Sequence, residues 1–257
     1  MRVNLADHVD RHIFYWGAYE PIESFLFLSS ITPGMTVIDA GANIGQYTVL
    51  SAQAVGPGGR VLSFEPSPRN FARLEENVQM NEFRNVQLFR SALWDREATL
   101  SFRFPETGNS GSFRQSESGE VEVKAMALDD LPGLTRVDMI KIDVEGSEPR
   151  VLLGAQAILR KFRPMILMEV NRQALMEGGT DTSHLLDVLK DLGYRMWRIG
   201  SAAQDSGDVE SLDSIQRSNC IAHCGELPDA ILRNWTERSA RKWARSSWFL
   251  PTLIPRV

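Results

Sequence analysis

Three acidic side chains follow one another closely near the middle of the chain. The stretch from 137 to 155, VDMIKIDVEGSEPRVLLGA, begins as a buried strand would and then carries Asp143, Glu145 and Glu148. Asp143 and Glu145 are two residues apart, so an extended backbone turns both side chains to the same side. Such carboxylates can take up a proton or bind a hard metal ion. Glu148 precedes Pro149 and has a structural interpretation, as an acid at the start of a helix.

A second polar pair has the same spacing at the end of a later predicted strand. Glu169 and Asn171 stand two residues apart in LMEVN, and the four side chains converge if the two strands are neighbours. One interpretation is a Mg²⁺ or Ca²⁺ site with Asp143, Glu169 and Asn171 as ligands. The other, which we favour, is a metal-free site that holds and deprotonates a hydroxyl group. His184, at the start of a predicted helix, is a further candidate base.

A glycine-rich turn follows the first predicted strand of the chain. It contains four residues suited to binding a ligand: Asp39, Gly41, Asn43 and Gly45. The pattern is G-x-N-x-G, with Gln46 where a dinucleotide fingerprint has its third glycine, so a nucleoside without a pyrophosphate fits better. Glu65 ends the second predicted strand, 20 residues beyond Gly45, where a carboxylate can accept hydrogen bonds from two ribose hydroxyls.

Strands and helices alternate along most of the chain. Helices are predicted at 44–56, 67–81, 149–162 and 183–193, and strands at 36–41, 60–66, 85–93, 138–144, 164–170, 194–199 and 218–224. Such alternation is typical of βαβ units, so we expect an α/β fold with a Rossmann-like, doubly wound, mostly parallel sheet of seven strands. In that fold, ligands bind beyond the carboxyl ends of the strands, where the polar side chains above are placed.

Three segments lie outside this alternation. We expect a helical lead-in at 1–30, a main domain at 31–226 with a hairpin inserted at 98–127, and a basic aromatic tail at 227–257. The polar segment 107–120 inside the hairpin is interpreted as a lid or acceptor-contacting loop. From Pro228 onward the tail has six basic and two acidic residues, with three tryptophans interleaved. A helix of that kind can touch an anionic membrane, bind an acidic acceptor, contact a second subunit in a homodimer, or dock on its own domain, which we favour.

The charge and composition of the chain argue against some partners and locations. The net charge of −5 argues against a nucleic-acid partner bound through the whole surface. No secretory signal and no run of about 18 apolar residues is found, and the two cysteines are expected to be free thiols, so a cytoplasmic location is expected.

The motifs together resemble a known family. Asp-x-Gly-x-Asn-x-Gly followed by Glu65 is similar to class I S-adenosylmethionine-dependent methyltransferases, and GAYEP, VIDAGANIGQYT and IKIDVEGSE resemble the FkbM family. The resemblance implies that Asp39 lies near the methionine amino group of the cofactor and that Glu65 holds the ribose. It also implies close backbone approach at Gly41, Asn43 and Gly45, an adenine pocket at Ser91 and Ala92, and contact of Asp143 with both cofactor and acceptor. For Glu20 in GAYEP it suggests a cofactor or acceptor role, and the alternative is a helix N-terminus before Pro21.

The resemblance also suggests a reaction. We expect methyl transfer from S-adenosylmethionine to a hydroxyl of a sugar, glycolipid or other secondary metabolite. Methyl transfer to a hydroxyl needs a base, for which the candidates are Asp143, Glu145, Glu169 and His184. N-methylation, methylation of nucleic acid, and a cofactor-binding module without chemistry are the alternatives, and Mg²⁺ is a possible but less favoured cofactor.

Overall fold

A computed structural model gives the fold of residues 1–103, 114–115, 119–199, 204–205 and 216–227. Its main sheet has the strand order β11-β10-β12-β9-β8-β1-β2-β3. The strands are β1 (Thr36–Ala40), β2 (Arg60–Phe64), β3 (Val86–Phe89), β8 (Met139–Ile142), β9 (Met165–Asn171), β10 (Arg195–Arg198), β11 (Gln204–Asp205) and β12 (Arg217–His223). All seven predicted strands are present, and β11 adds a two-residue edge.

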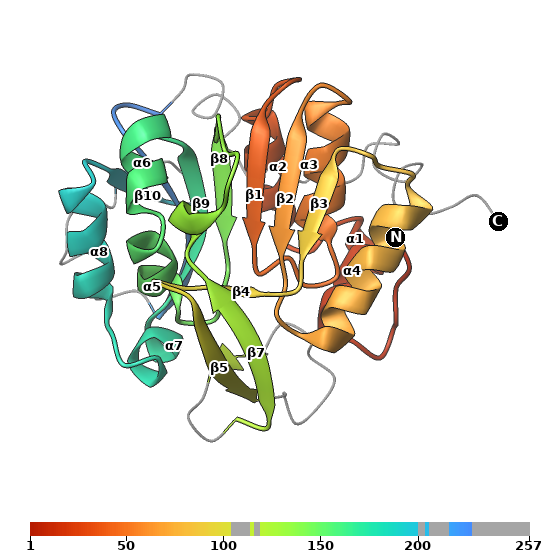
Figure 1. Ribbon diagram of the computed structural model, residues 1–257. Helices are drawn as coiled ribbons and strands as arrows, with labels where there is room; N and C mark the ends of the chain where they lie inside the picture. The colour runs from red at the N-terminus through yellow and green to blue at the C-terminus, as the bar shows by residue number, and fades with distance from the viewer. Residues whose placement is uncertain (104–113, 116–118, 200–203, 206–215, 228–257) are drawn as a thin grey trace.

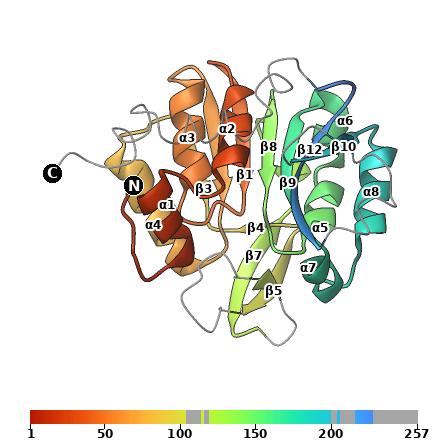
Figure 2. The same cartoon turned by 180° about the vertical axis from the view of Figure 1, so that it is seen from behind.

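The sheet is parallel from β9 to β3, and β12 and β10 continue it in antiparallel pairing. Helices cover both of its faces (Figures 1 and 2): α1 (His8–Trp16), α2 (Pro21–Ser29), α3 (Gln46–Val55), α4 (Pro68–Met80), α5 (Glu148–Leu153), α6 (Gln156–Phe162), α7 (Arg172–Glu177) and α8 (Thr182–Asp191). The core on one face includes residues of α2 and α3, and the core on the other includes residues of α5, α6 and α8. The predicted doubly wound, Rossmann-like sheet is therefore confirmed.

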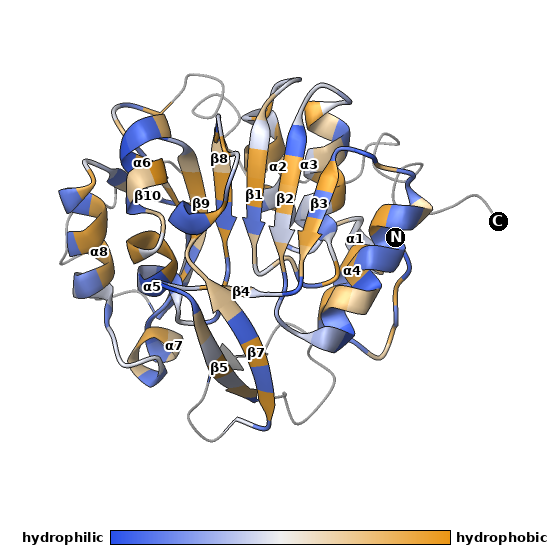
Figure 3. Cartoon of the chain, in the orientation of Figure 1, coloured by the Kyte–Doolittle hydropathy of each residue, from blue (hydrophilic) through white to orange (hydrophobic). Residues whose placement is uncertain are grey.

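Local sequence explains where several helices begin and end. Ser67 accepts a hydrogen bond from the backbone N–H of Asn70, and Pro68 occupies the first position of α4, as the sequence predicts. Gly56 follows the last residue of α3. Helix α8 buries Leu185, Leu186 and Leu189 and exposes Asp187, Lys190 and Asp191, and hydrophobic and hydrophilic residues alternate along α4 and α8 in Figure 3. Among the described residues, no helix is both long enough and apolar enough to cross a bilayer.

Two predicted elements are each divided in the structure. The helix expected at 149–162 is α5 and α6, because the backbone at Gly154 approaches the carbonyl oxygen of Trp94 so closely that a Cβ would clash there. Asp129 then begins α6 anew by accepting hydrogen bonds from the N–H groups of Ala157 and Ile158 at 2.8 and 2.9 Å. The strand expected at 85–93 leaves the main sheet after β3 and becomes β4 (Ala92–Leu93). Helix α7 was not predicted.

The inserted hairpin is confirmed and belongs to a small second sheet. Strands β5 (Ala98–Arg103) and β7 (Val121–Met126) pair antiparallel, and β4 and β6 (Arg114–Gln115) complete the order β4-β7-β5-β6. The arrowheads of β1, β2 and β3 point toward this small sheet, so it lies beyond the carboxyl ends of the main strands (Figure 1). Most of the predicted lid, 107–120, lies outside the described residues, as does the chain from 228 to 257.

The lead-in and the cysteines have clear places in the described structure. Helix α2 packs Leu26 and Phe27 into the same apolar cluster as residues of β1, β2 and β9, so the lead-in shares the core of the main domain. Leu227, at the predicted start of the tail, is buried in that cluster as well. Cys220 is buried in β12, Cys224 is half-buried just after it, and both are free thiols, as expected.

Candidate active site

A first cavity, open to solvent, lies where β1, β2 and β8 end. Apolar and aromatic side chains form one part of its wall: Phe64, Leu93, Trp94 and Phe102. Polar groups of Asn43, Glu65, Asp143 and Glu145 form another part. This combination can hold a flat, apolar ring system together with a polar group attached to it.

Glu65 lies in this cavity directly after β2 and is held in a fixed orientation. Its Oε2 accepts a hydrogen bond from the N–H of Asn43 at 2.8 Å, and its Oε1 accepts one from the N–H of Ser67 at 2.9 Å. Burial raises the pKa of Glu65 to about 7, although the two backbone hydrogen bonds oppose this effect. Each oxygen keeps a further lone pair, so the carboxylate can accept hydrogen bonds from a pair of neighbouring hydroxyl groups.

The glycine-rich turn has a left-handed backbone at three of its residues. The φ angles of Gly41, Asn43 and Gly45 are 78°, 51° and 93°. A Cβ at Gly41 would clash with the carbonyl oxygen of Asp143, and one at Gly45 would lie 2.6 Å from Cδ1 of Leu74. Gly41 and Asn43 line the first cavity, whereas Gly45 is required by packing on α4. Asn43 also has a buried Oδ1 that accepts no hydrogen bond within the described structure.

Asp39 lies beneath the turn, not in the cavity wall. It is fully buried in β1, and its Oδ2 accepts a hydrogen bond from Oγ1 of Thr48 at 2.7 Å. Burial raises the pKa of Asp39, and the charge of Lys141 opposes this effect. The predicted contact of Asp39 with a cofactor amino group stays a prediction.

A second cavity, with about 840 Å³ of empty space, adjoins the first. Asn43, Asp143 and Glu145 line both cavities. The other residues of the second cavity come from α1, the segment before α2, the glycine-rich turn, the start of α3, and strands β8, β9 and β12. Most are polar: His8, Val9, Tyr19, Glu20, Ala42, Ile44, Gln46, Tyr47, Lys141, Asn171 and Arg217. A ligand in the first cavity can therefore present a group to a second, polar ligand across Asp143.

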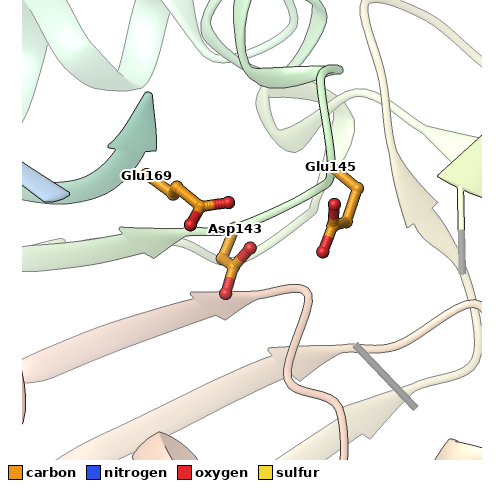
Figure 4. A group of neighbouring side chains, drawn as sticks. All are labelled: Asp143, Glu145 and Glu169. Atoms are coloured by element: carbon orange, nitrogen blue, oxygen red, sulfur yellow. The ribbon is translucent and has the colours of Figure 1, made fainter. Parts of the chain in front are cut away.

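The three carboxylates predicted to be catalytic lie close together in the structure. One oxygen from each of Asp143, Glu145 and Glu169 lies within 4.8 Å of the others, and Figure 4 shows the three side chains around a common space. The sequence suggested that Asp143 and Glu145 share one side of an extended backbone. The backbone is not extended here, because Glu145 has a left-handed φ of 53°. The loop turns here because Oε1 of Glu148 accepts hydrogen bonds from the N–H groups of Val144 and Gly146, both at 3.2 Å. Glu148 also begins α5, as expected.

Two cations pair with this group of carboxylates. Nζ of Lys141 lies 3.1 Å from Oδ2 of Asp143, and Arg217 forms an ion pair with Glu169. Burial lowers the pKa of Lys141, but the negative charges of Asp143, Asp39 and Glu20 outweigh it and raise the pKa overall. Burial and Asp143 raise the pKa of Glu169, and Arg217 opposes them.

Sequence reasoning selected neither of these cations. A lysine within the apolar run MIKI is the one signal that could have pointed to Lys141, because a buried lysine needs an anionic partner. Nothing comparable marks Arg217 in the sequence.

Comparison with known proteins agrees with this geometry. The family model described as the methyltransferase FkbM domain matches residues 39–196, more than half of the chain. The chain belongs to the FkbM methyltransferase family. It is thus an S-adenosylmethionine-dependent methyltransferase. The 2-O-methyltransferase NoeI of Sinorhizobium fredii is 32% identical over 179 residues, covering 61% of this chain and 72% of NoeI. The 31-O-demethyl-FK506 methyltransferase FkbM of Streptomyces tacrolimicus is 29% identical over 161 residues, covering 49% of this chain and 61% of that protein.

A solved structure of the same family name is also similar. Methyltransferase FkbM from Methylobacillus flagellatus KT is 14% identical, with a TM-score of 0.49, and the alignment covers 84% of this chain and 60% of that protein.

The remaining predicted residues of this FkbM methyltransferase have different surroundings. Ser91 and Ala92 line the first cavity, and Oγ of Ser91 donates to the carbonyl oxygens of Ala92 and Lys124, both at 3.0 Å. Asn171 lines the second cavity, but its Oδ1 accepts a hydrogen bond from the N–H of Ala174 at 3.2 Å and begins α7. His184 is exposed in the first turn of α8 and lines neither cavity.

Replacing His184 tests its predicted role as a base. We expect His184→Ala to keep methyl transfer within about twofold of wild type, because its imidazole is exposed on α8 away from the three carboxylates. Initial rates across pH 6 to 9 measure this. A loss of about 100-fold, the scale of removing a general base, would restore His184 as a catalytic residue.

Proposed function

We propose that this protein transfers a methyl group from S-adenosylmethionine to a hydroxyl oxygen of a small-molecule or glycan acceptor. The observation that carries the proposal is the junction of the two cavities at Asn43, Asp143 and Glu145. The nucleoside part of the cofactor belongs in the first cavity and the acceptor in the second. Transfer then needs no movement of either ligand between sites, because the two meet at Asp143.

The lining of the first cavity is chemically suited to the cofactor. Bound S-adenosylmethionine supplies an electrophilic methyl group on a sulfonium. Glu65 accepts hydrogen bonds from the ribose hydroxyls, and the wall at Ser91 and Ala92 lies against the adenine. The buried Oδ1 of Asn43, which has no partner among the described residues, is suited to accept a hydrogen bond from the methionine ammonium. Asp39 is fully buried in β1, and its Oδ1 also has no hydrogen-bond partner among the described residues, so contact with the methionine ammonium stays a prediction.

The second cavity fits an acceptor that carries hydroxyl groups. The acceptor oxygen forms its bond to the methyl carbon while the carbon–sulfur bond breaks, and the hydroxyl proton must pass to a base. Carboxylates line the cavity or adjoin it, with Asp143, Glu145 and Glu169 within 4.8 Å of one another. Their negative charge stabilises the positive charge that develops on the acceptor oxygen as it bonds to the methyl carbon.

Two relatives support oxygen as the methylated atom. NoeI is named a 2-O-methyltransferase, and FkbM is named for a 31-O-demethyl substrate. The chain spans 72% of the first and 61% of the second, so their acceptors are guides to the class of compound. The net charge of −5 speaks against a nucleic-acid acceptor.

An acceptor panel tests the proposal. The purified full-length chain is incubated with methyl-tritiated S-adenosylmethionine and separate sets of sugars, glycolipids, hydroxylated macrolides, amines and tRNA. We expect label in a hydroxyl compound, recovered as a methyl ether by mass spectrometry. Label found only on amine nitrogen or in tRNA would contradict the proposal.

The pairing of cations with the carboxylates favours a metal-free reaction. Lys141 already neutralises Asp143, and Arg217 already neutralises Glu169. We therefore expect 5 mM EDTA, roughly a thousandfold excess over a micromolar enzyme, to leave the transfer rate within about twofold. Added Mg²⁺ should not stimulate the rate. A complete loss with EDTA that Mg²⁺ restores would favour the metal site of Asp143, Glu169 and Asn171 instead.

A further inference from the structure

A carboxylate from the N-terminal lead-in lines the second cavity. Glu20 is the residue before α2, and its φ of 53° places it in the left-handed region. For a residue with a side chain this conformation costs roughly 1–3 kcal/mol, and such residues concentrate at functional sites. The backbone here is therefore bent at a cost, and the bend carries a carboxylate into the acceptor cavity.

The turn that binds the cofactor holds this segment in place. Gln46, the first residue of α3, accepts a hydrogen bond from the N–H of Tyr19 at 2.6 Å. Its Nε2 donates to the carbonyl oxygen of Tyr19 at 2.8 Å and to Oγ of Ser24 at 3.0 Å. Gln46 stands where a dinucleotide fingerprint has its third glycine. Its hydrogen bonds to Tyr19 and Ser24 fix the position of Glu20 relative to Asn43 and Asp143.

The charges around Glu20 differ from those around the other carboxylates. Asp143 is paired with Lys141 and Glu169 with Arg217, whereas Oε1 of Glu20 accepts a hydrogen bond at 3.0 Å from a neutral amide, Nδ2 of Asn219 in β12. Within the described part of the chain, no cationic side chain forms an ion pair with it.

The titratable and polar groups that act on Glu20 include Tyr19, Glu23, Tyr47, Lys141, Asp143 and Asn219. Burial, Asp143 and Glu23 raise the pKa of Glu20 to about 8, and Asn219 and Lys141 oppose them. A base is most effective when its pKa lies near the working pH, since it is then both ionised in part and basic enough.

We propose that Glu20 is the general base that accepts the proton of the acceptor hydroxyl, with Gln46 and Asn219 as positioning residues. This inference rests on the proposed function. As the acceptor oxygen bonds to the methyl carbon, its O–H bond breaks and the proton passes to Oε2 of Glu20, the oxygen that Asn219 does not hold. The electron pair of the carbon–sulfur bond stays on sulfur. Asp143 then faces cofactor and acceptor without having to take the proton.

Carboxyl titration tests this without any acceptor. Carbon-13 NMR of the full-length chain labelled at glutamate carboxyls should show a group titrating near pH 8 that is absent in Glu20→Gln. With S-adenosylhomocysteine bound, we expect its pKa to stay between about 7 and 9, because the proposed base remains unpaired. A fall below about 5 would show that Glu20 pairs with the ammonium of the cofactor and would overturn the inference.

Kinetics supply the second test, with Glu23→Gln as a matched control. Glu23 lies in the first turn of α2 and also hydrogen-bonds Asn219, but it does not line the cavity. We expect Glu20→Gln to lower kcat about 100-fold or more and to remove the acidic limb of the pH profile, with the Kd for S-adenosylmethionine within about threefold. Glu23→Gln should keep kcat, and both variants should unfold at similar temperatures.

Two further outcomes would count against Glu20. Equal losses in both variants would assign Glu20 a structural role, and a weakened Kd with unchanged kcat would assign it to cofactor binding. If the acceptor panel yields no hydroxyl product while the NMR titration behaves as expected, the proposed function fails and the ionisation of Glu20 is established separately.

Discussion

Glu65→Ala is expected to weaken binding of S-adenosylmethionine by about 100-fold or more. The carboxylate is held by the N–H groups of Asn43 and Ser67 at 2.8 and 2.9 Å, so it is oriented before the cofactor arrives. Hydrogen bonds to a charged group contribute about 1.5–3 kcal/mol each, and two ribose hydroxyls would lose theirs together. At 1.4 kcal/mol for each tenfold change, the loss reaches at least two orders of magnitude. Isothermal titration calorimetry measures it directly.

Glu75→Ala is the matched control for this change. Glu75 is exposed on α4, and the same truncation there should leave both the affinity and the unfolding temperature unchanged. An unchanged Kd in Glu65→Ala would remove the ribose assignment. Equal weakening in both variants would show a general loss of structure.

The affinity of the wild-type protein should depend on pH through the same carboxyl group. Burial raises the pKa of Glu65 to about 7, and only the ionised form accepts two hydroxyl hydrogen bonds. We expect the Kd at pH 6 to be about tenfold weaker than at pH 8, and this dependence to vanish in Glu65→Ala. The stability of the free protein should depend on pH in the opposite direction and fall as pH rises. Because the folded pKa exceeds the unfolded value of 4.5, Glu65 contributes less stability as pH rises toward 7.

Local signals in the sequence were sufficient for most of the fold. Period and capping predicted α4, with Ser67 and Pro68 at its start, and the alternation of strands and helices predicted the parallel order of the sheet. The division at Gly154 could not be predicted in this way. It depends on the backbone of Trp94, sixty residues earlier, and no local pattern records a contact of that kind.

The sequence predicted those residues of the site that lie at the carboxyl ends of strands. Glu65 and Asp143 directly follow β2 and β8, and Glu169 lies near the end of β9, so the parallel sheet places all three toward the same edge. Arg217 was missed because its place beside Glu169 requires that β12 pair antiparallel with β9. The family resemblance pointed to Glu20, but its hydrogen bond with Asn219, 199 residues away, is a contact that no local pattern in the sequence reports.

Asp143→Asn is expected to lower methyl transfer by about 100-fold and also to destabilise the fold. Asp143 lines both cavities, so its charge acts where the methyl group and the acceptor meet. It also forms an ion pair with Lys141, whose side chain is 8% exposed. Without the carboxylate, the buried ammonium keeps only the more distant charges of Asp39 and Glu20 and a long contact of 3.5 Å to the carbonyl oxygen of Gly41. We expect the free energy of unfolding to fall by about 1–3 kcal/mol, measured in urea.

The double variant Lys141→Met/Asp143→Asn separates the two effects. Removing the unpaired ammonium should restore most of the lost stability, because a buried ion pair can be replaced by apolar contact at little cost. Methyl transfer should stay low, since the charge at the junction of the cavities is still missing. Asp95→Asn is the control: it breaks an ion pair of 2.7 Å with Arg150 outside both cavities and should cost at most about 1 kcal/mol, with transfer unchanged. Recovery of transfer together with stability in the double variant would show that Asp143 acts only by anchoring Lys141.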